Sequence, residues 1–273
     1  MTSFFLWFDH ELLQKGEAYS NQTGTLYHYS DSRLPNTYKV YSSPYKQWVN
    51  DSSITGEVNP IIPTEFNSNS RSDDIIFDFE NGRVIETAGN FGTSETITGE
   101  FAVKDFNIYL TNETEEDLII ENKFKLNSRY GTPTMSGIEP YDQVTPAIFL
   151  NVEFSRNEGF ALGGMDQTNS TIKAVVLADS DYQLDGALSI FADSARKTVP
   201  KIPFSGHPST EYGDVKGGSY NYTGLAASYT DTPFFIDDVT VSKFSQRAQN
   251  SIPGDIKVGF MDFDISTQRF PRS

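Results

Sequence analysis

Residues 75–86 read Ile-Ile-Phe-Asp-Phe-Glu-Asn-Gly-Arg-Val-Ile-Glu, and this stretch carries the strongest fold signal in the chain. Up to Phe79, every second residue is apolar, which is the period of a strand with one buried face. Asn81-Gly82 then separates this run from a second β-type run at 83–86. Both central residues of a two-residue hairpin turn need positive φ, and Asn-Gly supplies them readily. The stretch therefore predicts a two-residue β-hairpin.

The same alternation recurs along most of the chain. It predicts further strands at 37–41, 96–103, 106–111, 118–124, 148–155, 172–177, 234–241 and 261–266. The 21 Phe and 14 Tyr residues agree with this, because aromatic rings pack well on a pleated surface. One buried and one solvated face per strand is typical of antiparallel sheets. We therefore expect a mainly β protein, either an antiparallel sandwich or two packed sheets, with long loops.

One segment, 181–197, has helical periodicity instead. Its apolar positions follow the spacing of one helix face: Leu184, Ala187, Leu188, Phe191, Ala192 and Ala195. Ser180 can cap the start, basic residues suit the C-terminal end, and Pro200 follows the expected stop. The pattern predicts the main helix here. A weaker pattern predicts a second helix at about 9–18.

The length of 273 residues suits one elaborated β domain, 1–273. A subdivision into 1–127 and 148–273 is the alternative, because residues 127–146 are rich in Pro and Gly and would form a linker. Residues 200–230 form a second irregular stretch with several Pro, Gly and Tyr residues. Long irregular segments in a compact domain usually serve as functional loops or arms.

Composition excludes several classes of function. The chain has 37 Asp plus Glu against 21 Lys plus Arg, a net charge of −16, and no basic stripe, so we expect no direct nucleic-acid partner. Cysteine is absent, which excludes disulfides and thiolate metal sites. No apolar run is long enough to span a membrane, and the apolar start at Phe4–Phe8 lacks a preceding basic region. We expect synthesis in a host cytoplasm, without a signal peptide and without a membrane partner.

The sequence contains no recognisable catalytic, cofactor or nucleotide motif. The three histidines, His10, His28 and His207, do not have the spacing of zinc ligands. His28 lies in a predicted strand and His207 in a predicted turn. Nucleophile elbows, phosphate-binding loops and dinucleotide fingerprints are all absent from the sequence. We therefore expect no enzyme activity, no catalytic residues, no cofactor and no metal.

Two patterns of carboxylates are candidate sites: acid pairs in predicted strands and an acid-rich loop. Asp237-Asp238 and Asp262-x-Asp264 lie in predicted strands, and alternation places Asp262 and Asp264 on one solvated face. Paired acids can hydrolyse glycosides, so a glycan hydrolase stays open as a less favoured function. The acids around 179–185 suggest a calcium loop, but the positions that should follow in such a loop are occupied by Gln, Leu and Ile.

The segment Val-Val-Leu-Ala-Asp-Ser-Asp-Tyr-Gln-Leu-Asp-Gly at 175–186 precedes the predicted helix, and Tyr-Asn-Tyr-Thr follows at 220–223. Together with the acidic, cysteine-free, Asn/Ser/Thr/Tyr-rich composition and an apolar start interpreted as a strand, these segments resemble virion proteins of tailed bacteriophages. The resemblance implies a structural subunit of the neck, tail or baseplate. It implies a location in the virion, and it carries no catalytic residues.

The tyrosines of the 200–230 stretch are the predicted interface. They are Tyr212, Tyr220, Tyr222 and Tyr229. Tyrosine is enriched in protein interfaces, where its ring is buried and its hydroxyl finds a partner. We expect this arm to contact further copies of the chain, as a homo-oligomer, and other virion proteins. The alternative is a module that binds carbohydrate on a host surface with the same exposed rings.

Overall fold

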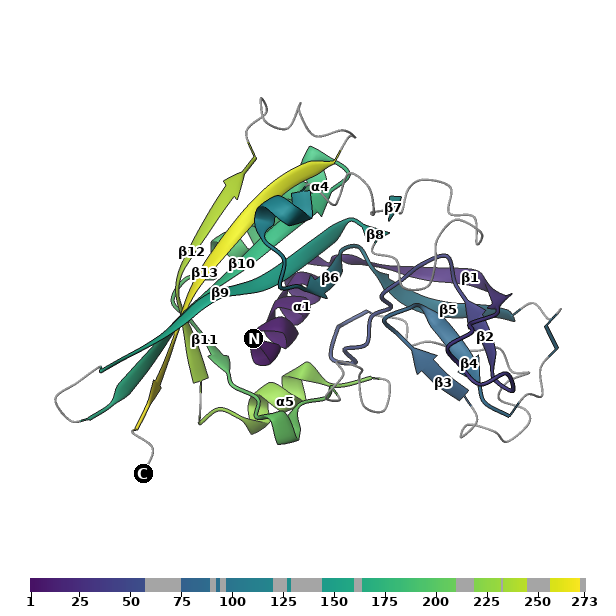
Figure 1. The fold of residues 1–273 in the computed structure, drawn as a ribbon, viewed down its shortest axis with the longest axis horizontal. Helices are drawn as coiled ribbons and strands as arrows, with labels where there is room; N and C mark the ends of the chain where they lie inside the picture. Colours follow the sequence, from purple (N-terminus) through teal and green to yellow (C-terminus); the bar gives the residue numbers. More distant parts are fainter. Residues whose placement is uncertain are drawn as a thin grey trace.

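The computed structural model describes residues 1–56, 75–88, 92–93, 97–119, 127–128, 144–159, 164–209, 219–231, 233–244 and 256–270. The protein is mainly β, as predicted, with two curled sheets and a few short helices. The sheets lie at opposite ends of the molecule, with helix α1 (Thr2–Gly16) between them (Figure 1).

The smaller sheet has five antiparallel strands. Their order is β3 (Ile75–Asp78), β4 (Arg83–Glu86), β2 (Lys39–Ser42), β1 (Tyr19–Tyr29) and β5 (Ile97–Lys104). Its core is aromatic: Trp48 stacks on Phe101 with ring centroids 4.5 Å apart. The predicted strands at 37–41, 75–80, 83–86 and 96–103 are therefore all present, with small changes at their ends.

The larger sheet has six strands. Their order is β11 (Lys197–Pro200), β12 (Pro233–Lys243), β13 (Lys257–Arg269), β10 (Asp166–Ala178), β9 (Ala147–Gly159) and β6 (Asn107–Leu110). Every neighbouring pair is antiparallel except β6 and β9, which are parallel. A separate two-residue parallel pair joins β7 (Asn127–Ser128) to β8 (Val144–Thr145).

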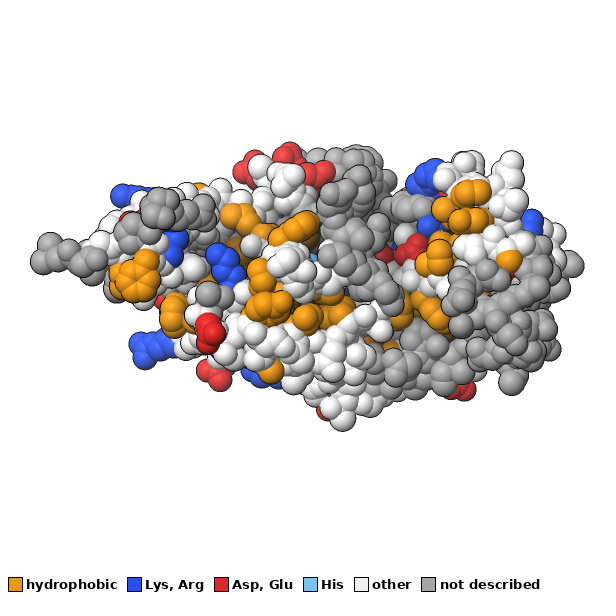
Figure 2. Space-filling view, turned by 90° about the horizontal axis from the view of Figure 1, so that it is seen from below, with side chains coloured by type: hydrophobic (Ala, Val, Ile, Leu, Met, Phe, Trp, Pro, Cys, Tyr) orange, Lys and Arg blue, Asp and Glu red, His pale blue; other side chains and the backbone are white. Residues whose placement is uncertain are grey.

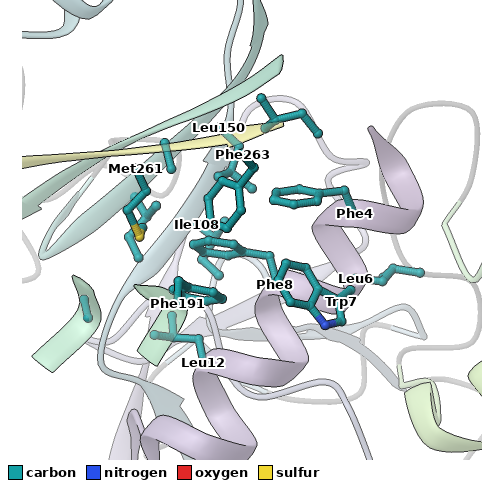
Figure 3. Close-up of a cluster of buried hydrophobic side chains, with 14 of the residues drawn as sticks. Phe4, Leu6, Trp7, Phe8, Leu12, Ile108, Leu150, Phe191, Met261 and Phe263 are labelled. Atoms are coloured by element: carbon teal, nitrogen blue, oxygen red, sulfur yellow. The ribbon is translucent and has the colours of Figure 1, made fainter. Parts of the chain in front are cut away.

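The main hydrophobic core lies between the six-stranded sheet and the helices α1 and α4 (Asp181–Ala192). Phe8 of α1 stacks on Phe191 of α4 with ring centroids 4.0 Å apart, and both rings meet Phe263 of β13 edge-on (Figure 3). Two shorter helical segments, η2 (Phe204–Gly206) and α5 (Tyr222–Ser228), lie on the chain that returns to β12.

Two helix predictions need correction. The helix predicted at 181–197 ends at Ala192, Arg196 has φ of 62°, and Lys197 begins strand β11. The longer helix is α1, which starts at Thr2 although the apolar run after Met1 suggested a strand. That run is buried on almost every side of the helix, so it lacks the apolar and polar faces by which a surface helix is recognised.

The hairpin at 75–86 forms, but its turn differs from the prediction. Asp78 pairs with Arg83, so four residues connect the strands rather than two. Of the pair Asn81-Gly82, Gly82 alone has positive φ, at 59°. Asp78 accounts for the longer turn, because its carboxylate accepts hydrogen bonds from the Asn81 backbone and side chain and from Arg83.

The prediction of a strand at 118–124 is wrong for the two residues of it that the structure describes, 118 and 119. Residues 115–119 are helical, and Thr114 caps this turn by accepting a hydrogen bond from the Asp117 amide. The rest of that segment, and most of the predicted linker at 127–146, lie outside the described residues. The boundary at 127–148 does not separate the sheets, because α1 and β6 precede it and pack with the six-stranded sheet.

Candidate functional site

Two of the four predicted interface tyrosines, Tyr220 and Tyr222, are buried inside their own chain. The Tyr220 amide donates to the Asn50 carbonyl at 2.9 Å, and its carbonyl accepts from the Ser52 amide at 2.7 Å. The ring of Tyr222 packs against His10 with centroids 4.5 Å apart. The sequence predicted that these two residues contact a neighbouring subunit; in this structure they hold the segment against α1 and the loop at 50–53 of their own chain.

Asp51 is the centre of this contact and is fully buried. His10 Nδ1 donates to one carboxylate oxygen at 2.7 Å. The other oxygen accepts from the Ser53 hydroxyl at 2.6 Å, the Ser53 amide at 3.0 Å and the Tyr222 amide at 3.0 Å. Burial acts to raise the pKa of Asp51, but these hydrogen bonds outweigh it and hold the pKa below its ordinary value.

A buried ion pair lies beside Asp51. Lys104, at the end of β5, donates to both carboxylate oxygens of Asp9 on α1 at 2.8 Å. The Tyr220 hydroxyl donates to the same carboxylate at 3.3 Å. Burial, with the nearby charge of Asp9 second, raises the pKa of Tyr220 well above its ordinary value.

Together these residues form a polar junction, defined here as Asp9, His10, Asp51, Lys104, Tyr220 and Tyr222. It joins α1, the smaller sheet and the start of α5 through side chains that are buried or nearly so. Separating the partners of a buried ion pair leaves each charge in the interior without compensation, which is costly. A fully hydrogen-bonded buried network therefore favours one arrangement of the elements that it joins. We interpret the junction as the contact that fixes the smaller sheet relative to α1 and the six-stranded sheet.

The other two predicted interface tyrosines are Tyr229 and Tyr212. Tyr229 is half-buried at the end of α5, with its hydroxyl against Gly206 of η2. Tyr212 lies outside the described residues. The carbohydrate-binding alternative needed the same rings to be displayed, and Tyr220 and Tyr222 do not meet that requirement.

The histidines outside the junction have local roles. His28 lies in β1, as predicted, with its ring edge-on to Tyr41. Burial first, and the Lys39 charge second, lower the pKa of His28. His207 is buried after η2, where its Nδ1 accepts a hydrogen bond from the Ser209 amide at 3.2 Å.

The carboxylates considered as catalytic or calcium sites lie on different elements: Asp237 and Asp238 on β12, Asp262 and Asp264 on β13, and the acids at 179–185 at the start of α4. Asp262 and Asp264 share the solvated face of β13, opposite Lys173 and Thr171 of β10, and Asp264 accepts from the Thr171 hydroxyl at 2.8 Å. Burial, only partly offset by Lys173, raises the pKa of Asp262. Within the described part of the chain, no group of three or more acidic or histidine side chains is arranged to hold a metal ion.

The feature that sequence reasoning missed is a projecting β-ribbon, made by the outer halves of β9, β10 and β13. In Figure 1 these strands extend past the helices toward the C-terminus. From Glu153 to Gly159 every side chain of β9 is exposed, and from Asp166 to Thr171 every side chain of β10 is half-buried. The ladder nevertheless continues to its end, where Gly159 and Arg269 both pair with Asp166.

Polar side chains support the ribbon in place of a core. Ser155 and Ser170 share a hydrogen bond of 2.5 Å across the β9–β10 pair, and Thr168 donates to Asn157 at 2.5 Å. The matching sequence signal was weak, because a segment with polar residues on both faces has no apolar alternation.

Apolar side chains are exposed at the base of the ribbon. Leu110 at the end of β6, Val152 and Phe154 are 52%, 37% and 51% exposed. A β-bulge between β9 and β10 lies at this point, next to the pair of Thr171 with Phe154. In the view from below, apolar side chains form several patches, separated by uncharged side chains and backbone and by scattered Lys, Arg, Asp and Glu side chains (Figure 2). Exposed apolar side chains beside an open strand are typical of surfaces that contact other proteins.

No protein-family model matches the chain, and no curated protein has a matching sequence. Among the described residues, no helix is long and apolar enough to cross a membrane.

Proposed function

We propose that this protein is a structural subunit of a tailed-phage virion that works through protein–protein contacts. One observation carries the proposal: the β-ribbon extends beyond the hydrophobic core, and its polar residues are well suited to contact with another protein. The acidic, cysteine-free composition and the resemblance of 175–186 and 220–223 to phage virion proteins support the location.

The ribbon supports an assembly function for an energetic reason. Ordering a residue costs about 1–2 kcal/mol of backbone entropy, and a three-stranded sheet needs a hydrophobic face to be stable by itself in water. This ribbon keeps its ladder to the tip with no apolar core around it. Contact with another subunit would bury its faces or edges and stabilise the ordered form.

Open strands are also a hazard that soluble proteins usually block. One edge of β9 pairs with β10, and the other edge pairs with β6 only along Ala147–Leu150. A longer exposed edge invites pairing with other chains unless that pairing is its function. An assembly subunit uses such an edge, because main-chain hydrogen bonds provide affinity and side chains select the partner.

The test uses the phage whose genome encodes the chain. Purified particles should contain the protein at a fixed copy number, measured by quantitative mass spectrometry. A variant in which Asn-Gly replaces residues 156–169, as a two-residue turn between the paired Ser155 and Ser170, should keep the thermal unfolding of the core but fail to enter particles. The Tyr182→Ala variant, altered at an 89% exposed ring on α4, is the control and should enter normally. Absence of the protein from infectious particles would refute the proposal.

A further inference from the structure

The outer edge of β9 is open over most of its length. Strand β6 pairs with β9 from Ala147 to Leu150 and ends at Leu110. Beyond that point, no strand in the described part of the chain pairs with this edge, up to Gly159. Alternate backbone N–H and C=O groups of residues 152–159 therefore point away from β10. Such a row of groups is a template for another strand.

The edge carries two opposite charges in a fixed arrangement. Arg156 and Glu158 lie two residues apart, so their side chains share one face of the ribbon. Their charged groups are 2.8 Å apart, and the side chains are 73% and 43% exposed. Any strand that pairs here must present compatible charges directly opposite, because like charges opposite each other are destabilising.

Antiparallel pairing of the edge with itself allows few registers. In an antiparallel ladder, two directly opposite residues either exchange two backbone hydrogen bonds or exchange none, so both must direct their backbone groups the same way, toward or away from the partner strand. In a symmetric pair of β9 edges, one residue therefore lies on the twofold axis opposite its own copy. An axis at Arg156 places two arginines opposite each other, and an axis at Ser155 leaves Arg156 opposite Phe154. An axis at Asn157 places each Arg156 opposite the second copy's Glu158.

This last register also fits sterically. It places Ser155 opposite the second copy's Gly159, and a Cβ atom built on Gly159 meets nothing within 4 Å. The two Arg156–Glu158 pairs then lie on one face beside each other and form four charges of alternating sign. The β-bulge of β9 lies before Ser155, outside the paired residues.

We propose that two copies of this chain associate by antiparallel pairing of their β9 edges over residues 155–159, with the twofold axis at Asn157. The pairing rests on the proposed assembly function and identifies its partner as a second copy. It joins the two projecting ribbons into one continuous sheet, with opposite charges matched across the new strand pair. Cross-strand charge pairs set the register, and main-chain hydrogen bonds provide the contact.

Charge reversal tests the register. Sedimentation velocity of the purified full chain over a concentration series should show a monomer–dimer equilibrium. Arg156→Glu alone or Glu158→Arg alone places like charges opposite each other twice, and should weaken the dimer by about tenfold or more. The double variant restores opposite charges and should recover the wild-type dissociation constant. Arg196→Glu, the same substitution at an exposed arginine between α4 and β11, is the matched control and should leave the dimer unchanged.

Three outcomes would overturn the pairing. The first is a wild-type chain that stays monomeric up to about 100 µM, since a weaker contact would have little specificity. The second is a double variant that fails to recover the dimer while its thermal unfolding matches that of the wild type. The third is a monomeric chain whose entry into particles is lost on charge reversal, because the edge would then bind a different virion protein.

In that third case the proposed function would stand. A dimer that is absent from particles would refute the function and leave the pairing intact.

Discussion

Replacing Gly82 with alanine tests how the smaller sheet is built. Gly82 has φ of 59°, a conformation that costs a residue with a side chain about 1–2 kcal/mol. An added Cβ would also lie 1.9 Å from the Tyr45 carbonyl oxygen and 3.1 Å from Trp48 Nε1. The first of these contacts is with backbone, so the loop at 43–48 must move, and such overpacking costs about 1–3 kcal/mol. The expected loss of unfolding free energy is about 2–5 kcal/mol.

The assay is urea unfolding followed by tryptophan fluorescence, because Trp48 stacks on Phe101 in the affected core. Gly186→Ala provides the matched control. Gly186 lies inside α4, and an added Cβ there meets nothing within 4 Å. The unfolding free energy of this variant should therefore rise by about 0.5–1 kcal/mol. A Gly82→Ala loss below about 1 kcal/mol would show that the hairpin turn and its contact with the loop are not as described.

Three further predictions concern the polar junction and α4. Lys104→Met leaves the buried Asp9 carboxylate without its cation and should lower the unfolding free energy by about 3–5 kcal/mol; an unchanged urea midpoint would contradict the buried pair. Asp51 has a depressed pKa, so its stabilisation is complete above the ordinary value of 3.8 and is lost as the pH falls toward its lower folded value. The free-energy difference between the wild type and Asp51→Asn should therefore shrink between pH about 5 and about 3, and a constant difference would contradict this. Ser180→Ala removes the cap that accepts from the Gln183 amide and should cost about 1 kcal/mol in thermal unfolding; no loss would show that the cap is dispensable.

Alternation in the sequence predicted the strands because burial and period coincide there. Along β13, Met261, Phe263 and Ile265 are buried while Asp262 and Asp264 face Lys173 and Thr171, as the pattern required. The same reasoning predicted α4, whose apolar face packs on the sheet. Its C-terminal end was misjudged because Lys197 pairs with Ile236 of β12, a distant contact that overrides the local helical pattern.

The candidate site was less predictable, for reasons of distance and exposure. Tyr220 finds its carboxylate partner, Asp9, 211 residues earlier in the chain, so its burial leaves no trace in the local sequence. The projecting ribbon is polar on both faces, and polar alternation does not distinguish a strand from a loop. What revealed it is the register of β9 with β10, which continues to Gly159 without a core.

Site-specific crosslinking in intact particles tests the central claim, that this chain assembles through its ribbon. A photoreactive phenylalanine analogue in place of Phe154, which is 51% exposed at the base of the ribbon, reports on what lies beside the β9 edge. The same analogue in place of Tyr182, 89% exposed on α4, is the control for random surface contact. We predict that position 154 crosslinks to a second copy of the chain in particles, while position 182 gives no such product. Particles that contain the chain but yield no adduct from position 154 would contradict the account.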